Sequence, residues 1–509
     1  MAGEPHSDTP EQQASAPTAP QDVIVQTAHA VTIAGRTIQY TVTTGTIVLK
    51  EEAEQKGEDA GKSDGEKPRA AIFFIAYTRD DTDDPGARPL TFSFNGGPGS
   101  SSVWLHLGVL GPRRVLLDPD GNMLPPPFRL VENEYSLLDE TDLVFIDPVS
   151  TGYSRAVQGE KAKPFHGFTK DIESVGDFIR LYTSRYQRWN SPKFLIGESY
   201  GTTRAGGLAG YLQERHAMYL NGIMLVSSIL NFQTARFNEG NDLPYILILP
   251  TYTATAWYHK RLDAELQRDL RATLDEVETF ALGDYTLALM KGDALPVEER
   301  SRIAQRLARY TGLSVEYVER CNLRVEIMRF TKELLREQRR TVGRLDSRFT
   351  GVDRDAAGET FEYDPSLAGI MGPYSATFNH YVRAELGFAS DLPYEILTGR
   401  VHPWSYGNFE NRYVDVSETL RQAMCVNPFL KVFIASGYYD LATPYCATDY
   451  TVNHMHLEPE GRARISTAYY EAGHMMYVHI PSLAQLKDDL AGFIRRTLAG
   501  ENEGQGTRG

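Results

Sequence analysis

The stretch KFLIGESYGTTRAGGLAG, residues 193–210, decides the fold. Residues 194–196 form a short apolar run suited to a buried strand, and Ser199 follows between Gly197 and Gly201. Glycine is costly in regular structure. A G-x-S-x-G pattern after a strand therefore predicts a tight strand-to-helix turn that raises a nucleophilic serine above a sheet. Small residues that favour close helix-to-sheet packing come next: Ala205, Gly206, Gly207, Ala209 and Gly210.

The motif alone is a weak signal, and an ordinary strand–turn–helix is the alternative. Strand and helix signals alternate around it, which predicts an α/β fold with a mostly parallel sheet. An antiparallel hairpin is expected over residues 30–49, and the charged residues 50–69 predict a solvated loop. From about residue 262 to 345 the spacing is helical. The simplest architecture is an α/β core interrupted by a mainly helical cap.

The predicted organisation has a core in two parts with the cap between them and a tail at each end. In chain order the segments are a disordered tail (1–28), the first part of the core (29–240), the cap (241–400), the second part of the core (401–498) and a disordered tail (499–509).

Composition excludes several classes of function. The net charge of −15 disfavours nucleic-acid binding, which needs clustered Lys and Arg. Three cysteines form no disulfide framework and have no zinc spacing, so we expect neither a metal nor another cofactor. The N-terminus lacks the basic and apolar regions of a signal peptide, and no run of 18 apolar residues could span a membrane. These features predict a soluble cytoplasmic protein without membrane partners.

A nucleophilic serine needs a base and an acid, which in α/β-hydrolases follow in the order Ser, Asp or Glu, His. Asp440 follows the strand pattern FLKVFIASG, and His474 follows the next strand pattern directly behind a glycine. Both residues therefore have the expected order and strand–loop context. Other candidates are less well placed: His454, His456, His479, Asp415 and Asp449.

A glycine-rich loop, FNGGPGSSSVWL (residues 94–105), stands at the end of a predicted strand. Such a loop leaves backbone N–H groups open to a developing oxyanion. The residue after the serine, Tyr200, would supply the second N–H donor. A phosphate-binding loop is the alternative, but Pro98 removes a donor and no G-K-[ST] follows.

Taken in order, FNGGPGSSS, FIDPVSTGYS, GESYG, SGYYD and AGHMM resemble the serine carboxypeptidase family. The resemblance covers most of the chain outside the tails and the cap. It implies an α/β-hydrolase fold and removal of residues from peptide C-termini, preferentially at acid pH. It also implies that Ser199 is the nucleophile, His474 the general base and acid, and Asp440 the orienting carboxylate. Gly97 and Tyr200 would supply the oxyanion N–H groups.

The same resemblance implies a site for the free C-terminus of a peptide, formed by Asn95, Gly96 and Glu198. A protonated Glu198 can donate a hydrogen bond to a carboxylate, and burial favours that protonated form by raising its pKa. The structural alternative is that Glu198 is only a packed neighbour of the serine.

Three positions depart from the family pattern. Val109 stands where a second glutamate is usual, Ser100 replaces a common cysteine, and Ser93 replaces an aromatic residue. The first change removes a proton-sharing partner for Glu198. The leading hypothesis is a serine carboxypeptidase acting on peptides with a free C-terminus. The alternatives are an esterase or acyltransferase with the same triad, and a catalytically silent binding protein.

Overall fold

The structure, a computed structural model, describes residues 20–54 and 62–505. Its central sheet consists of β1 (Val23–Ile33), β2 (Arg36–Glu54), β3 (Ser63–Arg79), β4 (Leu90–Phe94), β7 (Asp142–Ile146), β8 (Arg155–Ala156), β9 (Lys193–Ser199), β10 (Gly222–Ser228), β13 (Lys431–Gly437) and β14 (Ile465–Tyr470). The spatial order is β1-β2-β3-β7-β4-β9-β10-β13-β14, with β8 beside β3. All pairs from β7 to β14 are parallel, and those from β1 to β7 are antiparallel. The predicted α/β fold with a mostly parallel sheet is confirmed.

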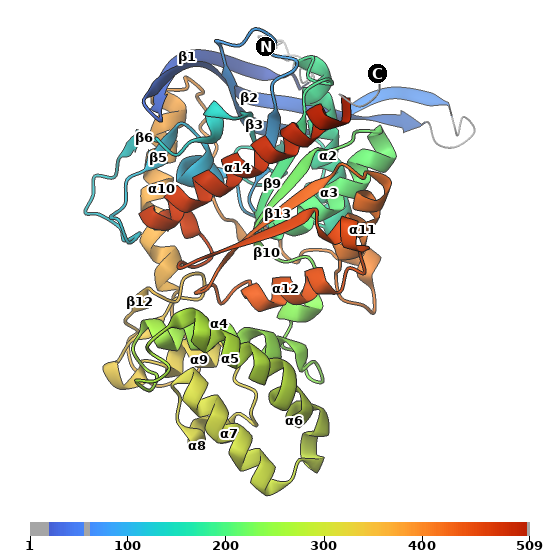
Figure 1. Cartoon of the computed structure of the whole chain (residues 1–509). Helices are drawn as coiled ribbons and strands as arrows, with labels where there is room; N and C mark the ends of the chain where they lie inside the picture. The colour runs from blue at the N-terminus through green and yellow to red at the C-terminus, as the bar shows by residue number, and fades with distance from the viewer. Residues whose placement is uncertain (1–19, 55–61, 506–509) are drawn as a thin grey trace, which may run out of the picture.

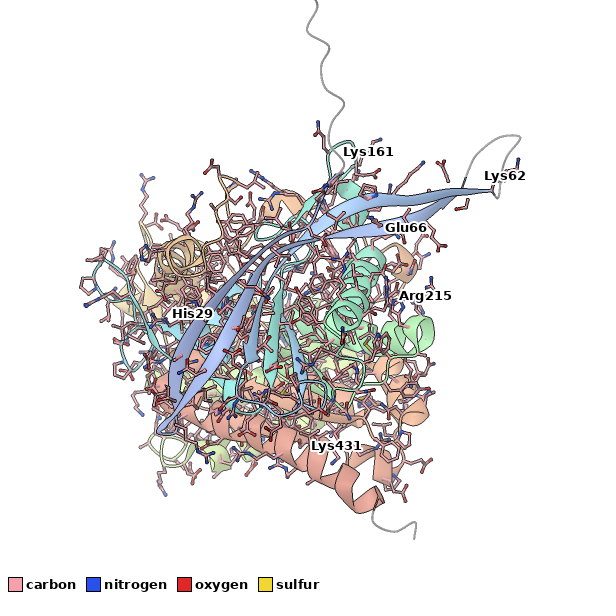
Figure 2. All side chains as sticks on the ribbon, turned by 90° about the horizontal axis from the view of Figure 1, so that it is seen from above. His29, Lys62, Glu66, Lys161, Arg215 and Lys431 are labelled. Atoms are coloured by element: carbon pink, nitrogen blue, oxygen red, sulfur yellow. The ribbon has the colours of Figure 1, made fainter. Side chains whose placement is uncertain are left out.

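The N-terminal strands correct two predictions. β1 pairs with β2 from Val23 onward, so part of the segment 1–28 is a strand, and residues 1–19 lie outside the described residues. The charged segment 50–69 continues both β2 and β3, which still pair at Glu54 and Ser63. The two strands form an arm that leaves the rest of the molecule (Figure 2). Both faces of this arm are exposed to solvent. Residues 50–69 therefore show no alternation of apolar and polar residues from which strands could be predicted.

Helices cover both faces of the sheet (Figure 1). Side chains of β3 show the division, because Phe74 packs with the helices of one face and Ile75 with those of the other. The first face carries α2 (Phe168–Arg185), α3 (Tyr200–His216) and α11 (Ser417–Val426). The second carries α1 (Val103–Leu105), the π-helix η2 (His106–Leu110), α10 (Pro365–Ala384) and α14 (Ile480–Gln505). α14 extends into the predicted tail 499–509, whose last residues, 506–509, are outside the described part.

A separate helical lobe lies below the sheet in Figure 1 and has a hydrophobic core of its own. It contains α4 (Leu243–Tyr258), α5 (Leu270–Phe280), η6 (Ala281–Tyr285), α6 (Thr286–Lys291), α7 (Val297–Thr311), α8 (Val315–Arg320), α9 (Ile327–Glu333), β11 (Thr341–Val342) and β12 (Thr350–Gly351). α10 also falls within the predicted cap 241–400, but its Tyr374 and Phe378 pack into the cluster beside the sheet. Helical periodicity does not reveal which body a helix packs against.

The three cysteines differ in their exposure to solvent. Cys321 is buried, Cys446 is half-buried, Cys425 is exposed, and all three are free thiols. Within the described ranges, no helix combines the length and apolar character needed to cross a bilayer.

Candidate active site

Ser199 lies at the sharp turn from β9 into α3, with φ 60° and ψ −129°. Positive φ is unfavourable for a residue with a Cβ and costs about 1–3 kcal/mol. The flanking glycines allow the turn because the backbone is crowded. A Cβ on Gly197 would lie 2.3 Å from the carbonyl oxygen of Gly201, and one on Gly201 would lie 2.8 Å from that of Phe94. The turn brings Ser199 to the wall of a cavity of about 880 Å³ at the carboxyl end of the parallel strands.

Asp440 and His474, predicted from separate loops, are in contact. The Oδ2 atom of Asp440 lies 2.7 Å from Nδ1 of His474. Its Oδ1 atom accepts hydrogen bonds from the backbone N–H groups of Ala442 and Thr443, at 2.8 and 3.0 Å. The carboxylate is therefore fixed on both sides. Because Nδ1 is engaged by Asp440, Nε2 is the ring nitrogen left for Ser199, which lines the same cavity.

The electrostatics of His474 suit a general base. Burial lowers its pKa, but the charge and hydrogen bond of Asp440 raise it by more, so the net pKa lies above the ordinary value. Glu198 also raises the pKa of His474, and Arg344 lowers it. An imidazolium formed by accepting a proton from Ser199 is therefore stabilised by the neighbouring carboxylate.

The loop between β11 and β12 (residues 343–349, the β11–β12 loop) supports both triad loops. The N–H of His474 donates to the Leu345 carbonyl at 2.7 Å, and the N–H of Gly473 donates to Asp346 at 3.1 Å. On the other side, the N–H of Leu441 donates to the carbonyl of Arg344 at 3.1 Å. This loop of the cap thus bonds directly to the backbone beside the acid and the base.

The glycine-rich loop after β4 packs against the serine turn. A Cβ on Gly96 would lie 2.4 Å from the backbone nitrogen of Tyr200, so no larger residue fits there without displacement. The N–H of Tyr200 begins α3 and has no intrahelical acceptor. Gly97, with φ 101°, lines the cavity beside Tyr200. Both residues predicted to supply the oxyanion donors therefore line the same cavity as Ser199.

Asn95 and Glu198 form a buried pair at the cavity wall. The Asn95 Nδ2 group donates to Glu198 Oε1 at 2.8 Å, while its Oδ1 accepts from the N–H of Leu105 at 3.1 Å. Burial raises the pKa of Glu198 to about 7, and the charge of His474 opposes part of this rise. Glu198 is therefore mostly protonated below pH 7 and can donate a hydrogen bond to an anionic group.

Arg204 is a functional-site residue that no sequence motif indicates. It is 1% exposed and forms a two-point ion pair with Asp171, at 2.8 and 3.1 Å. Its Nη1 also donates to the backbone carbonyl of Asn95 at 2.6 Å. Arg204 thus holds the start of the glycine-rich loop. The sequence signal for such a residue is an arginine within a helix of small residues, because a charge buried there requires a partner.

We expect Arg204→Met to destabilise the protein by about 3–5 kcal/mol, because it leaves the Asp171 carboxylate buried and unpaired. Urea unfolding would measure the loss. Arg215→Met removes an exposed arginine from the same helix and should change stability by less than about 0.5 kcal/mol (Figure 2). The double variant Asp171→Leu, Arg204→Met should recover part of the loss. Equal stability of Arg204→Met and the parent protein would contradict the assigned role.

Other candidates lie elsewhere. His454 and His456 are exposed, and His479 contacts Ser482 at 2.8 Å. Asp449 accepts hydrogen bonds from Tyr469 away from Ser199. The cavity is bounded instead by residues that the sequence did not single out. They include Trp104, Phe232, Arg236, Ile327, Met328, Arg344, Phe361, Asp364, Leu367, Trp404 and Tyr406.

Comparisons with known proteins agree with these motifs. The family model described as serine carboxypeptidase matches residues 63–496. Serine carboxypeptidase-like 45 of Arabidopsis thaliana is 28% identical over 184 residues, 34% of this chain and 36% of that protein. The pheromone-processing carboxypeptidase KEX1 of Saccharomyces cerevisiae is 34% identical over 152 residues, 28% of this chain and 19% of that protein. These alignments span about a third of the first relative and about a fifth of the second.

A solved structure extends the likeness in fold. The crystal structure of KEX1(Δ)p, a prohormone-processing carboxypeptidase from Saccharomyces cerevisiae, has a TM-score of 0.52 to this chain at 16% identity. The superposition covers 90% of this chain and 91% of that one. The order of strands and the position of the serine turn are those of an α/β-hydrolase.

Proposed function

Because this chain belongs to the serine carboxypeptidase family, we propose that it releases C-terminal amino acids from peptides through an acyl-enzyme formed on Ser199. One observation carries the proposal: Ser199, His474 and Glu198 line one cavity, with Asp440 2.7 Å from the far ring nitrogen of His474. A serine carboxypeptidase needs a nucleophile and a nearby site for the terminal carboxylate. Here Glu198 directly precedes the nucleophile.

The reaction follows from the placement of the groups. Nε2 of His474 accepts the proton of the Ser199 hydroxyl as its oxygen attacks the scissile carbonyl. The N–H groups of Gly97 and Tyr200 stabilise the oxyanion, each donor contributing about 3 kcal/mol. The imidazolium then gives its proton to the leaving amine, which departs as the C-terminal amino acid. Water, activated by His474, hydrolyses the acyl-enzyme and restores Ser199.

In this proposal the C-terminus of the substrate is bound by Asn95, Gly96 and Glu198. Protonated Glu198 donates a hydrogen bond to the substrate carboxylate, and Asn95 fixes its orientation through Oε1. Gly96 lends a backbone N–H from the loop that packs against the serine turn. A neutral C-terminal amide or ester makes fewer of these contacts.

The pH dependence should separate the two kinds of substrate. Catalysis requires neutral His474, so kcat/KM should fall for every substrate as the pH drops through its raised pKa. Above pH 7 Glu198 ionises and repels a substrate carboxylate, so KM should rise for free-carboxyl peptides alone. The groups that face Glu198 and influence its titration are His474, Tyr477, Asn95 and Asp440.

The test compares a blocked dipeptide having a free carboxyl group with its amide and with a short-chain ester from pH 5 to 9. We expect kcat/KM to favour the free carboxyl by roughly 10- to 100-fold below pH 7, the size of a hydrogen bond to a charged group. Glu198→Gln cannot ionise, so its KM should stay level above pH 7. A preference for the ester or amide would instead support the esterase or acyltransferase hypothesis, which Val109 favours.

The free thiols support a cytoplasmic location, which we also propose. Cys425 is exposed and unpaired, a state typical of proteins kept in a reducing compartment. Fractionation of cells that express the native protein would test this, and recovery outside the cytoplasm would refute it.

A further inference from the structure

The position usual for a second glutamate in the family is filled by an apolar side chain. Val109 lies in η2, is 0% exposed, and packs in the hydrophobic cluster beside the sheet. No carboxyl group from this position can share a proton with Glu198.

Two tyrosines fill the space against η2. A Cβ on Gly108 would lie 2.4 Å from Cε2 of Tyr477 and 2.9 Å from the hydroxyl of Tyr374. Tyr477 comes from the short turn η11 (Met476–Val478), three residues after His474. Gly108, which has no side chain, leaves room for the Tyr477 ring beside the serine turn.

The polar atoms at this point lack partners. Glu198 Oε2 and the hydroxyl of Tyr477 are both buried, and neither has a hydrogen-bond partner of ordinary geometry among the described residues. Yet the two side chains are close enough for each to shift the pKa of the other. Asn95, which holds Glu198 Oε1, also lies close enough to shift the pKa of Tyr477. Two unsatisfied buried polar groups side by side are costly unless they bond to each other.

We propose that Tyr477 is a positioning residue that replaces the second glutamate: its hydroxyl hydrogen-bonds to Glu198 Oε2 and holds the carboxyl group toward the substrate's C-terminus. The inference rests on the proposed carboxypeptidase function. Tyr477 does not line the cavity and acts through Glu198. A phenol stays neutral across the working pH range, so Glu198 meets no second carboxylate. Binding of the free C-terminus thus depends on a single titrating carboxyl group, which burial keeps protonated to near-neutral pH.

The variant Tyr477→Phe removes only the hydroxyl. For free-carboxyl peptides we expect KM to rise roughly 3- to 10-fold with kcat nearly unchanged, the effect of one lost hydrogen bond. The pH at which KM begins to rise should move upward, because the Tyr477 hydroxyl lowers the pKa of Glu198. Amide substrates should show neither change. In a Glu198→Gln background, where this side chain cannot ionise, Tyr477→Phe should not change the pH dependence of KM.

Tyr285→Phe is the matched control, since it removes an equally buried hydroxyl that bonds to the carbonyl of Leu323 in the cap. It should leave KM and its pH dependence unchanged. The inference would be overturned if Tyr477→Phe left KM for free-carboxyl peptides and its pH dependence unchanged. It would also be overturned if amide substrates showed the same changes. If Tyr477→Phe does not fold, Tyr477→Met, which also lacks the hydroxyl, is subject to the same criteria. Wild-type protein without a preference for free carboxyl groups would instead refute the proposed function and, with it, the premise of this inference.

Discussion

Replacing Ser199 by alanine is expected to lower kcat for peptide hydrolysis by roughly 10⁴- to 10⁶-fold. The hydroxyl is the only atom lost, and it is the group that forms the acyl bond. The residual rate would come from the oxyanion N–H groups and from substrate binding. Alanine carries the same Cβ as serine at φ 60°, so the thermal unfolding midpoint should hardly change. Steady-state kinetics and labelling by a fluorophosphonate probe would measure the loss.

The control for Ser199→Ala is Ser436→Ala, which removes another buried serine hydroxyl. Ser436 lies in β13, and its hydroxyl has no hydrogen-bond partner among the residues that the structure describes. It should keep near-normal activity and probe labelling. Turnover by Ser199→Ala within tenfold of the parent protein would end the acyl-enzyme proposal. Failure of the wild-type protein itself to label would revive the hypothesis of a catalytically silent binding protein.

Asp440→Asn should lower kcat by roughly 10³- to 10⁴-fold through the tautomer of His474. Oδ1 of Asp440 accepts two backbone N–H bonds, from Ala442 and Thr443, so the asparagine oxygen should take that place. The NH₂ group would then face Nδ1 of His474 and donate to it. Nε2 would carry the proton and could no longer accept one from Ser199. The kcat values across pH would measure this effect.

Asp346→Asn provides the comparison for Asp440→Asn. Asp346 also lies near the histidine loop, but it accepts from the N–H of Gly473 rather than from the ring of His474. We expect it to cost less than about tenfold in kcat, since its amide oxygen can still accept that bond. Equal losses in both variants would mean that the acids support the loop alike and that Asp440 has no special role in orienting the base.

The elements near the motifs could be predicted from sequence because local chemistry specifies them. The glycines around Ser199 are needed for close backbone approach. The apolar run before Asp440 is the buried strand β13, whereas the strand before His474, β14, is partly exposed at the edge of the sheet. The arm of β2 and β3 cannot be predicted in this way, for the opposite reason. Its charged residues reach solvent on both sides, so they read as a loop although the backbone pairs to Glu54.

Side chains that act across the fold could not be predicted in this way. Arg204 is five residues from the serine, but its partner Asp171 belongs to another helix. Tyr477 lies near His474 in sequence, yet its relation to Glu198 depends on the space left by Gly108 in η2. Each depends on tertiary packing, which composition and periodicity do not encode.

The β11–β12 loop limits how the helical lobe can be exchanged or moved. Because the backbone beside His474 and Asp440 is bonded to Leu345 and Arg344, a tilt of the lobe would be transmitted to the imidazole. Chimaeras that graft a different lobe to alter side-chain preference should keep residues 343–349 with the recipient's hydrolase core. If the new lobe is joined outside β11 and β12, both strands stay with the core. The geometry of proton transfer would then be preserved while the substrate pocket is redesigned.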